Sequence, residues 1–183
     1  MEPHWPSLIG PKPYQKDYLS DQHNSQDMKD RLRIKMADKD DIWEIATLDK
    51  QYFSSPWSYD AFKSEFNNPA SFIFVGKLEN KSIAYLIVRI VADEMEILKI
   101  LVDPDHRRKG VARSLLNKAI DLAQDLNLNT LYLEVSKKNL VALSLYKDFG
   151  FKEYEIRKDY YNKGEDAILM KLEISDYKEE QAA

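Results

Sequence analysis

The sequence predicts a single mixed α/β domain, in which helices flank one β-sheet. The chain has 183 residues, which is long enough for one sizeable core and too short for two. Segments rich in β-branched and aromatic residues alternate along the chain with segments in which apolar residues have helical spacing. The composition, 44% hydrophobic and 32% charged, is typical of a globular protein with many surface ion pairs.

The N-terminal third is expected to contain a flexible extension, one strand and two helices. Residues 1–30 carry scattered prolines and polar residues without periodicity, which is typical of a flexible extension. Leu32–Met36 alternates as a short strand, and Asp38 is a suitable N-cap for the helix that follows. Pro56 interrupts the helical pattern, which resumes over Tyr59–Phe66.

The middle of the chain is expected to form three strands and a long helix. Ser71–Leu78 and Ile83–Val91 are separated by a short polar turn and therefore form a hairpin, followed by a third strand over Met95–Val102. The chain then turns through residues 103–110 into a helix whose apolar residues, over 111–126, make one stripe.

The C-terminal part is expected to add a strand, a short helix and a second hairpin. The strand covers Thr130–Val135, and the helix covers Leu140–Asp148. Phe151–Tyr161 and Ala167–Ile174 form the hairpin, and a polar tail follows over residues 176–183.

Composition excludes several classes of function. The net charge of -4 gives no electrostatic footprint for a polyanion, so we expect no direct nucleic-acid binding. No apolar run approaches the roughly 20 residues that span a bilayer, and the first ten residues do not resemble a signal peptide. We therefore expect no membrane association and a cytoplasmic location.

The absence of cysteine excludes disulfides, thiolate metal sites and an acyl-cysteine intermediate. The chain has three histidines, and two of them, His4 and His23, lie in the expected extension. We therefore expect no metal site.

The turn after the third strand has the features of a pyrophosphate site. Arg107, Arg108 and Lys109 supply positive charge, and Gly110 allows close approach of the backbone at the start of the next helix. Such basic clusters also occur in solvated turns, so this feature alone leaves both interpretations open. The loop is neither a Walker loop nor a dinucleotide fingerprint, which argues against ATP and NAD.

The same loop resembles the signature of the GNAT superfamily, Gln/Arg, two residues, Gly, one residue, Gly/Ala, with Arg107, Gly110 and Ala112 at the key positions. Other segments resemble the RimI-like ribosomal-protein alanine N-acetyltransferases. They are Ser55-Pro56-Trp57-Ser58, Leu131-Tyr-Leu-Glu134-Val, Asn139, Ala142, Leu145-Tyr146, Gly150-Phe151, Arg157-Lys-Asp-Tyr160-Tyr161 and Glu165-Asp166-Ala167-Ile168.

The resemblance covers Leu32–Ile174 and implies a GNAT-like domain over residues 31–175, with a central mixed, mostly antiparallel twisted sheet. It implies an acyltransferase that uses acetyl-CoA as co-substrate and no metal. The implied acceptor is the N-terminal amine of a protein, with an alanine of a small-subunit ribosomal protein as the candidate.

For the cofactor, the resemblance assigns backbone contacts with the pantetheine arm to Ile100, Leu101 and Val102. The pyrophosphate loop would consist of Arg107, Arg108, Lys109, Gly110, Val111, Ala112 and Arg113. Asn139 would also contact the cofactor, although it is equally well placed to cap the helix that begins at Leu140.

For the chemistry, the resemblance assigns the general base to Glu134 and the general acid to Tyr146. Strand alternation turns Glu134 away from the face of Leu133, where a carboxylate can take a proton from an acceptor amine. The alternative is a glutamate at the end of a strand that faces solvent. Tyr146 follows the helical spacing of Phe149, so it could instead be a core residue.

Trp57, Tyr160 and Tyr161 match segments that line the acceptor groove in similar enzymes, although each could simply pack in the core. Lys99 is a departure, because those proteins commonly have a polar uncharged residue there, and it leaves the shape of the acceptor pocket open. Two other functions remain open: a GNAT enzyme for a small amine or another protein N-terminus, and a non-catalytic acetyl-CoA-binding module.

Overall fold

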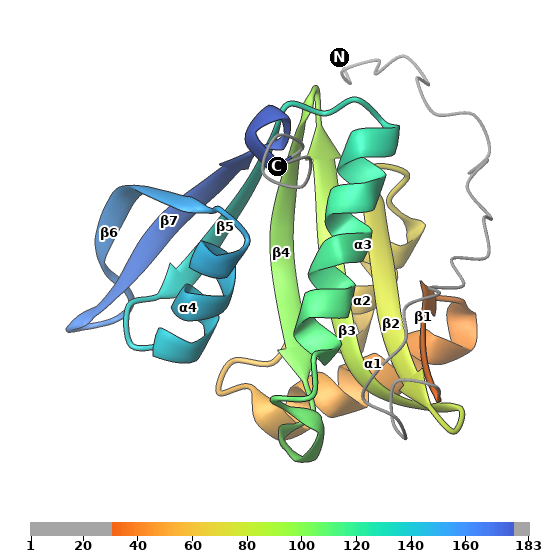
Figure 1. The fold of residues 1–183 in the computed structure, drawn as a ribbon. Coiled ribbons are helices and arrows are strands. Elements are labelled where there is room, and N and C mark those ends of the chain that lie inside the picture. Colours follow the sequence, from red (N-terminus) through yellow and green to blue (C-terminus); the bar gives the residue numbers. More distant parts are fainter. Residues whose placement is uncertain (1–30, 178–183) are drawn as a thin grey trace, which may run out of the picture.

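A computed structural model describes residues 31–177, and these form one sheet with helices on both faces (Figure 1). The strands are β1 (Leu32–Met36), β2 (Ser71–Leu78), β3 (Lys81–Val91), β4 (Glu94–Val102), β5 (Thr130–Ser136), β6 (Lys152–Asn162) and β7 (Glu165–Glu173). The helices are α1 (Lys39–Tyr52), α2 (Tyr59–Asn67), a 3-10 turn η1 (Pro104–His106), α3 (Val111–Asp125) and α4 (Leu140–Asp148). The expected extension, residues 1–30, and residues 178–183 of the expected tail lie outside the described residues.

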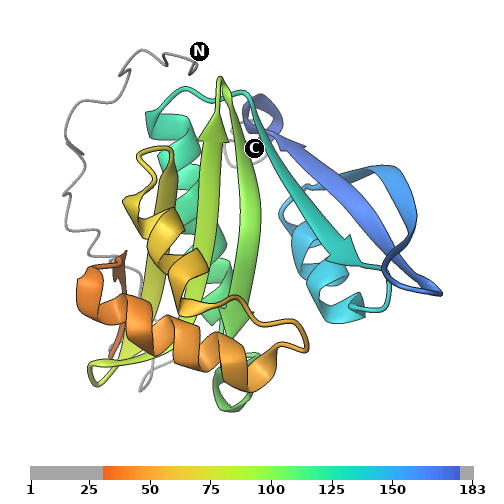
Figure 2. The same cartoon turned by 180° about the vertical axis from the view of Figure 1, so that it is seen from behind.

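The seven strands lie in the order β1-β2-β3-β4-β5-β7-β6, and only β4 and β5 pair in parallel. The predicted mixed, mostly antiparallel sheet is therefore confirmed. Helices α3 and α4 cover one face, and α1 and α2 cover β2–β4 on the other (Figures 1 and 2). On that second face none of the helices in residues 31–177 covers β5–β7 (Figure 2). Within residues 31–177, no helix is long and apolar enough to cross a membrane.

Each helical layer encloses its own group of core side chains. Between α3 and the sheet, Leu115, Leu116 and Ala119 are fully buried, as the apolar stripe of this helix predicts. Between α1 and the sheet, Ile42 and Ile45 pack against β2 and β3. Full burial of one such aliphatic side chain stabilises the fold by about 1.5–3 kcal/mol, so the two layers stabilise one face of the sheet and the β2–β4 part of the other.

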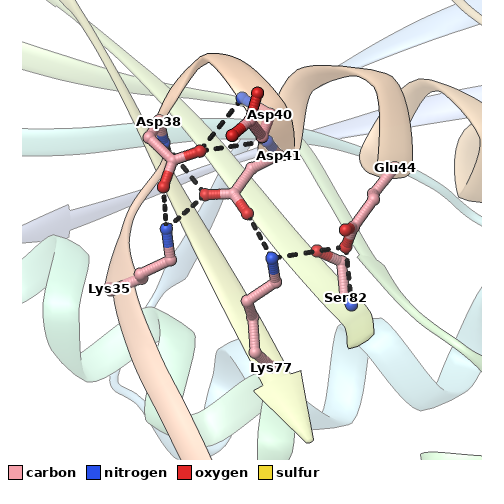
Figure 3. A network of polar contacts seen from close by, with 7 residues as sticks. All are labelled: Lys35, Asp38, Asp40, Asp41, Glu44, Lys77 and Ser82. Atoms are coloured by element: carbon pink, nitrogen blue, oxygen red, sulfur yellow. Dashed lines mark hydrogen bonds and ion pairs between the residues drawn. The ribbon is translucent and has the colours of Figure 1, made fainter. Parts of the chain in front are cut away.

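The start of α1 is held by a group of ion pairs, which we call the Asp41 network (Figure 3). Asp38 is the N-cap, as predicted, and it forms a reciprocal capping box with Asp41. The Asp41 carboxylate also accepts hydrogen bonds from Lys35 of β1 and Lys77 of β2, each at 2.5 Å. These contacts attach the first turn of the helix to the outer strands of the sheet.

The centre of the sheet opens between its two parallel strands. β4 and β5 pair only over Glu94–Ile97 and Thr130–Leu133, and beyond these residues the two strands diverge (Figure 1). The register between β3 and β4 also shifts at this point, where Ile87 pairs with Lys99 and Val88 with Ile97. Leu98 is therefore an additional residue in β4, as in a β-bulge. We call the opening between the carboxyl halves of β4 and β5 the gap.

Candidate active site

The turn that leads into α3 combines an open surface with unpaired helix amides. Gly110 has a φ of 83°, in the left-handed region, and nothing lies within 4 Å of the position where a Cβ would stand. It is the N-cap of α3, and within residues 31–177 there is no side-chain cap hydrogen bond at the start of this helix. Backbone N–H groups at a helix start bind anions, so this turn fits the pyrophosphate of acetyl-CoA.

The cations of this loop also hold its shape. The Arg107 side chain donates to the carbonyl of Val102 at 3.0 Å, and Lys109 donates to the carbonyl of Asp105 at 3.0 Å. Arg113 pairs with Asp148 of α4 at 2.7 Å. The charge is therefore arranged around the open turn, while Arg107 also connects the end of β4 to the loop.

The expected pantetheine contacts lie on an open edge of β4. Ile100, Leu101 and Val102 pair with β3 on one side. On the other side they face the gap, because β5 has already diverged. Within the described residues no strand pairs with them on that side, so their backbone groups there, apart from the Val102 carbonyl that accepts from Arg107, can pair with an extended ligand.

Asn139 caps α4, where its side chain accepts a hydrogen bond from the amide of Ala142 at 3.2 Å. Its capping role is thus a structural fact. Its contact with the cofactor remains a prediction.

Glu134 lies in a polar cluster on the uncovered face of the sheet. Strand alternation buries Leu133 and Val135 on the opposite face, as predicted. The Glu134 carboxylate accepts a hydrogen bond from Arg157 of β6. Tyr160 lies near Glu134, and interaction with this carboxylate raises the pKa of the Tyr160 hydroxyl. The carboxylate is thus held by neighbours on β6 and is not simply a solvated side chain.

Two tyrosines of β6 interact electrostatically with Glu134, and one of them also interacts with the predicted general acid, Tyr146. The rings of Tyr160 and Tyr161 are 5.1 Å apart. Burial, followed by the charge of Glu134, raises the pKa of Tyr161 to about 12. Tyr161 in turn contributes, after burial, to a raised pKa at Tyr146 of α4. The structure therefore brings Glu134, Tyr160, Tyr161 and Tyr146 into one region.

Tyr146 is also a core residue, since 4% of its surface is exposed and its ring contacts Phe151 at 5.7 Å. Among the side chains that the structure describes, its hydroxyl has no hydrogen-bond partner. Core packing and a catalytic role are therefore compatible at this position.

An open hollow of about 290 Å³ lies beside Glu134, where β4 and β5 still pair. Carboxylates and tyrosines dominate its polar lining. The lining residues are Val91, Glu94, Met95, Glu96, Tyr132, Leu133, Glu134, Tyr154, Arg157 and Leu169.

Trp57 lies on the β4 side of the gap, in the segment between α1 and α2. This segment passes beside the end of β4 on the side of the gap (Figures 1 and 2). The Trp57 ring packs against Phe62 at 5.5 Å, and its backbone amide donates to Asp49 at 2.7 Å.

The Asp49 network, which we define as Asp49, Tyr85, Lys99 and the Trp57 amide, was missed by sequence reasoning. Asp49 is fully buried and accepts hydrogen bonds from Tyr85 and, at 2.8 Å, from Lys99. A signal was present, because Asp49 is four residues from Ile45 and lies on the apolar face of α1. Lys99, noted only as a departure from the family pattern, is the buried cation of this group.

Comparison with known proteins identifies the class. Residues 40–151, more than half of the chain, match the acetyltransferase (GNAT) family. The chain belongs to this family and is an N-acetyltransferase. The predicted resemblance is thereby confirmed.

Two curated relatives carry the name of an N-acetyltransferase. The chain is 37% identical over 132 residues to the ribosomal protein bS18-alanine N-acetyltransferase of Escherichia coli K12, covering 70% of this chain and 88% of that protein. A putative enzyme of the same name from Bacillus subtilis is 31% identical over 151 residues, covering 81% of this chain and 100% of the relative.

Solved structures of N-acetyltransferases have the same fold as this chain. The crystal structure of the ribosomal-protein-S18-alanine N-acetyltransferase from Escherichia coli matches with a TM-score of 0.74 at 34% identity, covering 78% of this chain and 94% of that one. Arabidopsis thaliana NAA60 in complex with acetyl-CoA has the same fold, with a TM-score of 0.73 at 16% identity, and the match covers 79% of this chain and 99% of that one.

Proposed function

We propose that the protein transfers an acetyl group from acetyl-CoA to the N-terminal α-amine of a protein, with the N-terminal alanine of ribosomal protein bS18 as the substrate. The observation that carries the proposal is that Glu134, at the point where β5 leaves β4, and Tyr146 of α4 both interact electrostatically with Tyr161 of β6. The names of the curated relatives support the choice of acceptor.

The chain has no cysteine, which supports direct transfer without an acyl-cysteine intermediate. Acetyl-CoA, when bound, supplies the acetyl group as a thioester. The residues that would hold it are the Gly110 turn with its cations and the open edge of β4.

Glu134 acts as the general base. An acceptor amine is mostly protonated at neutral pH and must lose a proton before it can attack a thioester. A carboxylate oxygen of Glu134 takes this proton directly or through one water molecule. The hydrogen bond from Arg157 holds the carboxylate in one orientation for this step.

Tyr146 acts as the general acid. Burial raises the pKa of its hydroxyl, so the hydroxyl keeps its proton at neutral pH. It donates this proton to the sulfur that leaves.

The acceptor class is tested by transfer from labelled acetyl-CoA to a panel of N-terminal peptides, with polyamines and lysine side-chain peptides as controls. We expect transfer to the peptide that starts with alanine. Faster transfer to a polyamine or a lysine side chain would contradict the proposed acceptor. Binding of acetyl-CoA without transfer to any amine would indicate a non-catalytic module.

The two catalytic assignments are tested by Glu134→Gln and Tyr146→Phe, which preserve shape and remove only the base or the acid. Each should lower turnover by roughly 100-fold at neutral pH, with little change in acetyl-CoA affinity. The Glu134 variant should recover partly at higher pH, because the acceptor amine then loses its proton unaided. Glu155→Gln, at an exposed carboxylate of β6, is the matched control and should keep normal turnover. Near-normal turnover in both catalytic variants would return these residues to purely structural roles.

The cofactor loop is tested by thermal unfolding with acetyl-CoA, ATP and NADH. Acetyl-CoA should raise the melting temperature, since a ligand of the native state stabilises it, and the other two should not. Gly110→Val should abolish most of this shift. Gly164→Val is a matched control, because Gly164 also has a left-handed φ, of 78°, and open space at its Cβ position. An equal acetyl-CoA shift in both variants would contradict the loop assignment.

A further inference from the structure

The bulge in β4 brings a lysine into the core beside the gap. Because Leu98 is an additional residue in the strand, the alternation of side chains changes there, and Lys99 lies on the α1 face. Its side chain is 7% exposed. Its ammonium nitrogen lies 4.1 Å from the centre of the Phe53 ring and 5.1 Å from that of the Trp57 ring.

The Asp49 carboxylate connects this lysine with two other parts of the fold, β3 and the segment between α1 and α2. This carboxylate accepts hydrogen bonds from Tyr85 of β3, Lys99 of β4 and the backbone amide of Trp57. Two of these donors, Lys99 and Trp57, share one oxygen atom, Oδ2. The position of residues 53–58, which we call the acceptor wall, therefore depends on the lysine through a single carboxylate oxygen and two ring faces.

Stability alone does not account for a buried ion pair at this place. Desolvation of two charges offsets most of their attraction, and apolar residues of similar volume are often as stable. The pair lies where β4 leaves β5, at the point where the segment between α1 and α2 passes the end of β4 (Figure 2).

We propose that Lys99 is a positioning residue, which together with Asp49 holds the acceptor wall in the geometry that receives the acceptor amine. The inference rests on the proposed function in one respect, namely that residues 53–58 line the acceptor groove. Lys99 itself does not touch the reacting atoms.

The first test is a kinetic comparison of Lys99→Met with the wild-type protein. Methionine is an unbranched side chain only one atom shorter, and it removes the charge and the hydrogen bond to Asp49. The KM for the acceptor should rise by about five- to tenfold, while kcat and the KM for acetyl-CoA change by less than about twofold. Lys99→Arg, which keeps a charged donor, should restore most of the acceptor KM.

The matched control is Lys77→Met. It removes a lysine partner from Asp41, the other fully buried carboxylate of α1, far from the gap. A general loss of stability in α1 would affect both variants alike. The inference requires that only the Lys99 variant changes the acceptor KM.

The second test is amide hydrogen exchange over residues 53–58. Exchange at Trp57 should become faster in Lys99→Met and remain unchanged in Lys77→Met. Should Lys99→Met fold poorly, the triple variant Asp49→Leu, Tyr85→Phe and Lys99→Met removes the three polar side chains of the buried network and serves both tests.

An unchanged acceptor KM, or unchanged exchange at the acceptor wall, would overturn the inference. Transfer by the wild-type protein to a polyamine instead of a peptide would contradict the proposed function only. In that case the KM for the polyamine and the exchange at Trp57 still decide the role of Lys99.

Discussion

Helix α1 carries two fully buried carboxylates, one near each end, and their surroundings differ. Asp41 is held by lysines whose side chains are 39% and 17% exposed, at the outer edge of the sheet (Figure 3). Asp49 is held by a lysine that is 7% exposed, at the centre of the sheet beside the gap.

The lysines of the two networks differ also in their acid–base behaviour. Burial lowers the pKa of Lys77, but its contact with Asp41 outweighs burial and the net shift is upward. Burial also lowers the pKa of Lys99, and there Asp49 does not compensate fully, so the net shift is downward. Two buried carboxylates of one helix thus have different surroundings: Asp41 takes part in the capping of α1, and Asp49 contacts the segment 53–58. The exposure of the lysine partner distinguishes the two sites.

The largest expected effect separates the two carboxylates by stability. Asp49→Asn leaves Lys99 as a buried, unpaired cation and should lower the free energy of unfolding by about 3–5 kcal/mol. Asp41→Asn should cost about 1.5–3 kcal/mol, because Lys35 and Lys77 can turn to water. Denaturant unfolding of both variants measures the difference. Equal losses would show that exposure of the partner is not the deciding factor.

A smaller effect should follow when the three polar side chains of the Asp49 network are replaced together. The triple variant Asp49→Leu, Tyr85→Phe and Lys99→Met should be more stable than Asp49→Asn by at least about 2 kcal/mol, because no buried charge is left unpaired. Asp41→Leu with Lys77→Met should show no such recovery, since it also destroys the capping box of α1. The same denaturant unfolding measurement compares these two variants with their single mutants.

The smallest expected effect is the pH dependence of the two lysine variants, Lys77→Met and Lys99→Met. For each variant, the free energy of unfolding is subtracted from that of the wild-type protein at several pH values between about pH 8 and about pH 11.5. The folded protein holds the Lys77 proton more tightly than the unfolded chain does. The stabilisation by Lys77 is therefore present below the usual pKa of 10.5 and is lost as the pH rises through the raised value. The difference in free energy of unfolding between the wild-type protein and Lys77→Met should therefore become smaller as the pH rises in this range.

Lys99 should show the opposite sign. Its folded pKa is lowered, so the unfolded chain binds more protons between that value and 10.5, and wild-type stability rises with pH in this window. The difference in free energy of unfolding between the wild-type protein and Lys99→Met should therefore become larger as the pH rises. Parallel pH profiles for the two variants would contradict the contrast between the networks.

Most of the fold could be predicted from the sequence, because periodicity and capping are local. The predicted bounds of the α3 and α4 helices and of the final hairpin agree with the structure within a few residues, and Asp38 caps α1 as expected. The divergence of β4 from β5 could not be predicted in this way. Ile97, Leu98 and Ile100–Val102 are all apolar, so their pattern has no period of two that would reveal the bulge.

The site was only partly predictable for the same reason. Alternation along β5 placed Glu134 on the correct face. Its partner Arg157 was not expected, because it depends on the register of β6. The pairing of Asp49 with Lys99 joins residues 50 positions apart, and only the packing of α1 against the sheet brings them together. The roles assigned to the catalytic and cofactor residues remain predictions.

The irregular pairing of β6 has a consequence for the behaviour of the protein at high concentration. β6 is an edge strand, and its register with β7 is interrupted between Arg157 and Asn162, where Asp159 has a φ of 54°. A strand with such a break, and with charged residues along it, is a poor template for a strand from another molecule. We therefore expect the interrupted segment, which also carries Tyr160 and Tyr161, to disfavour association of this edge with other molecules.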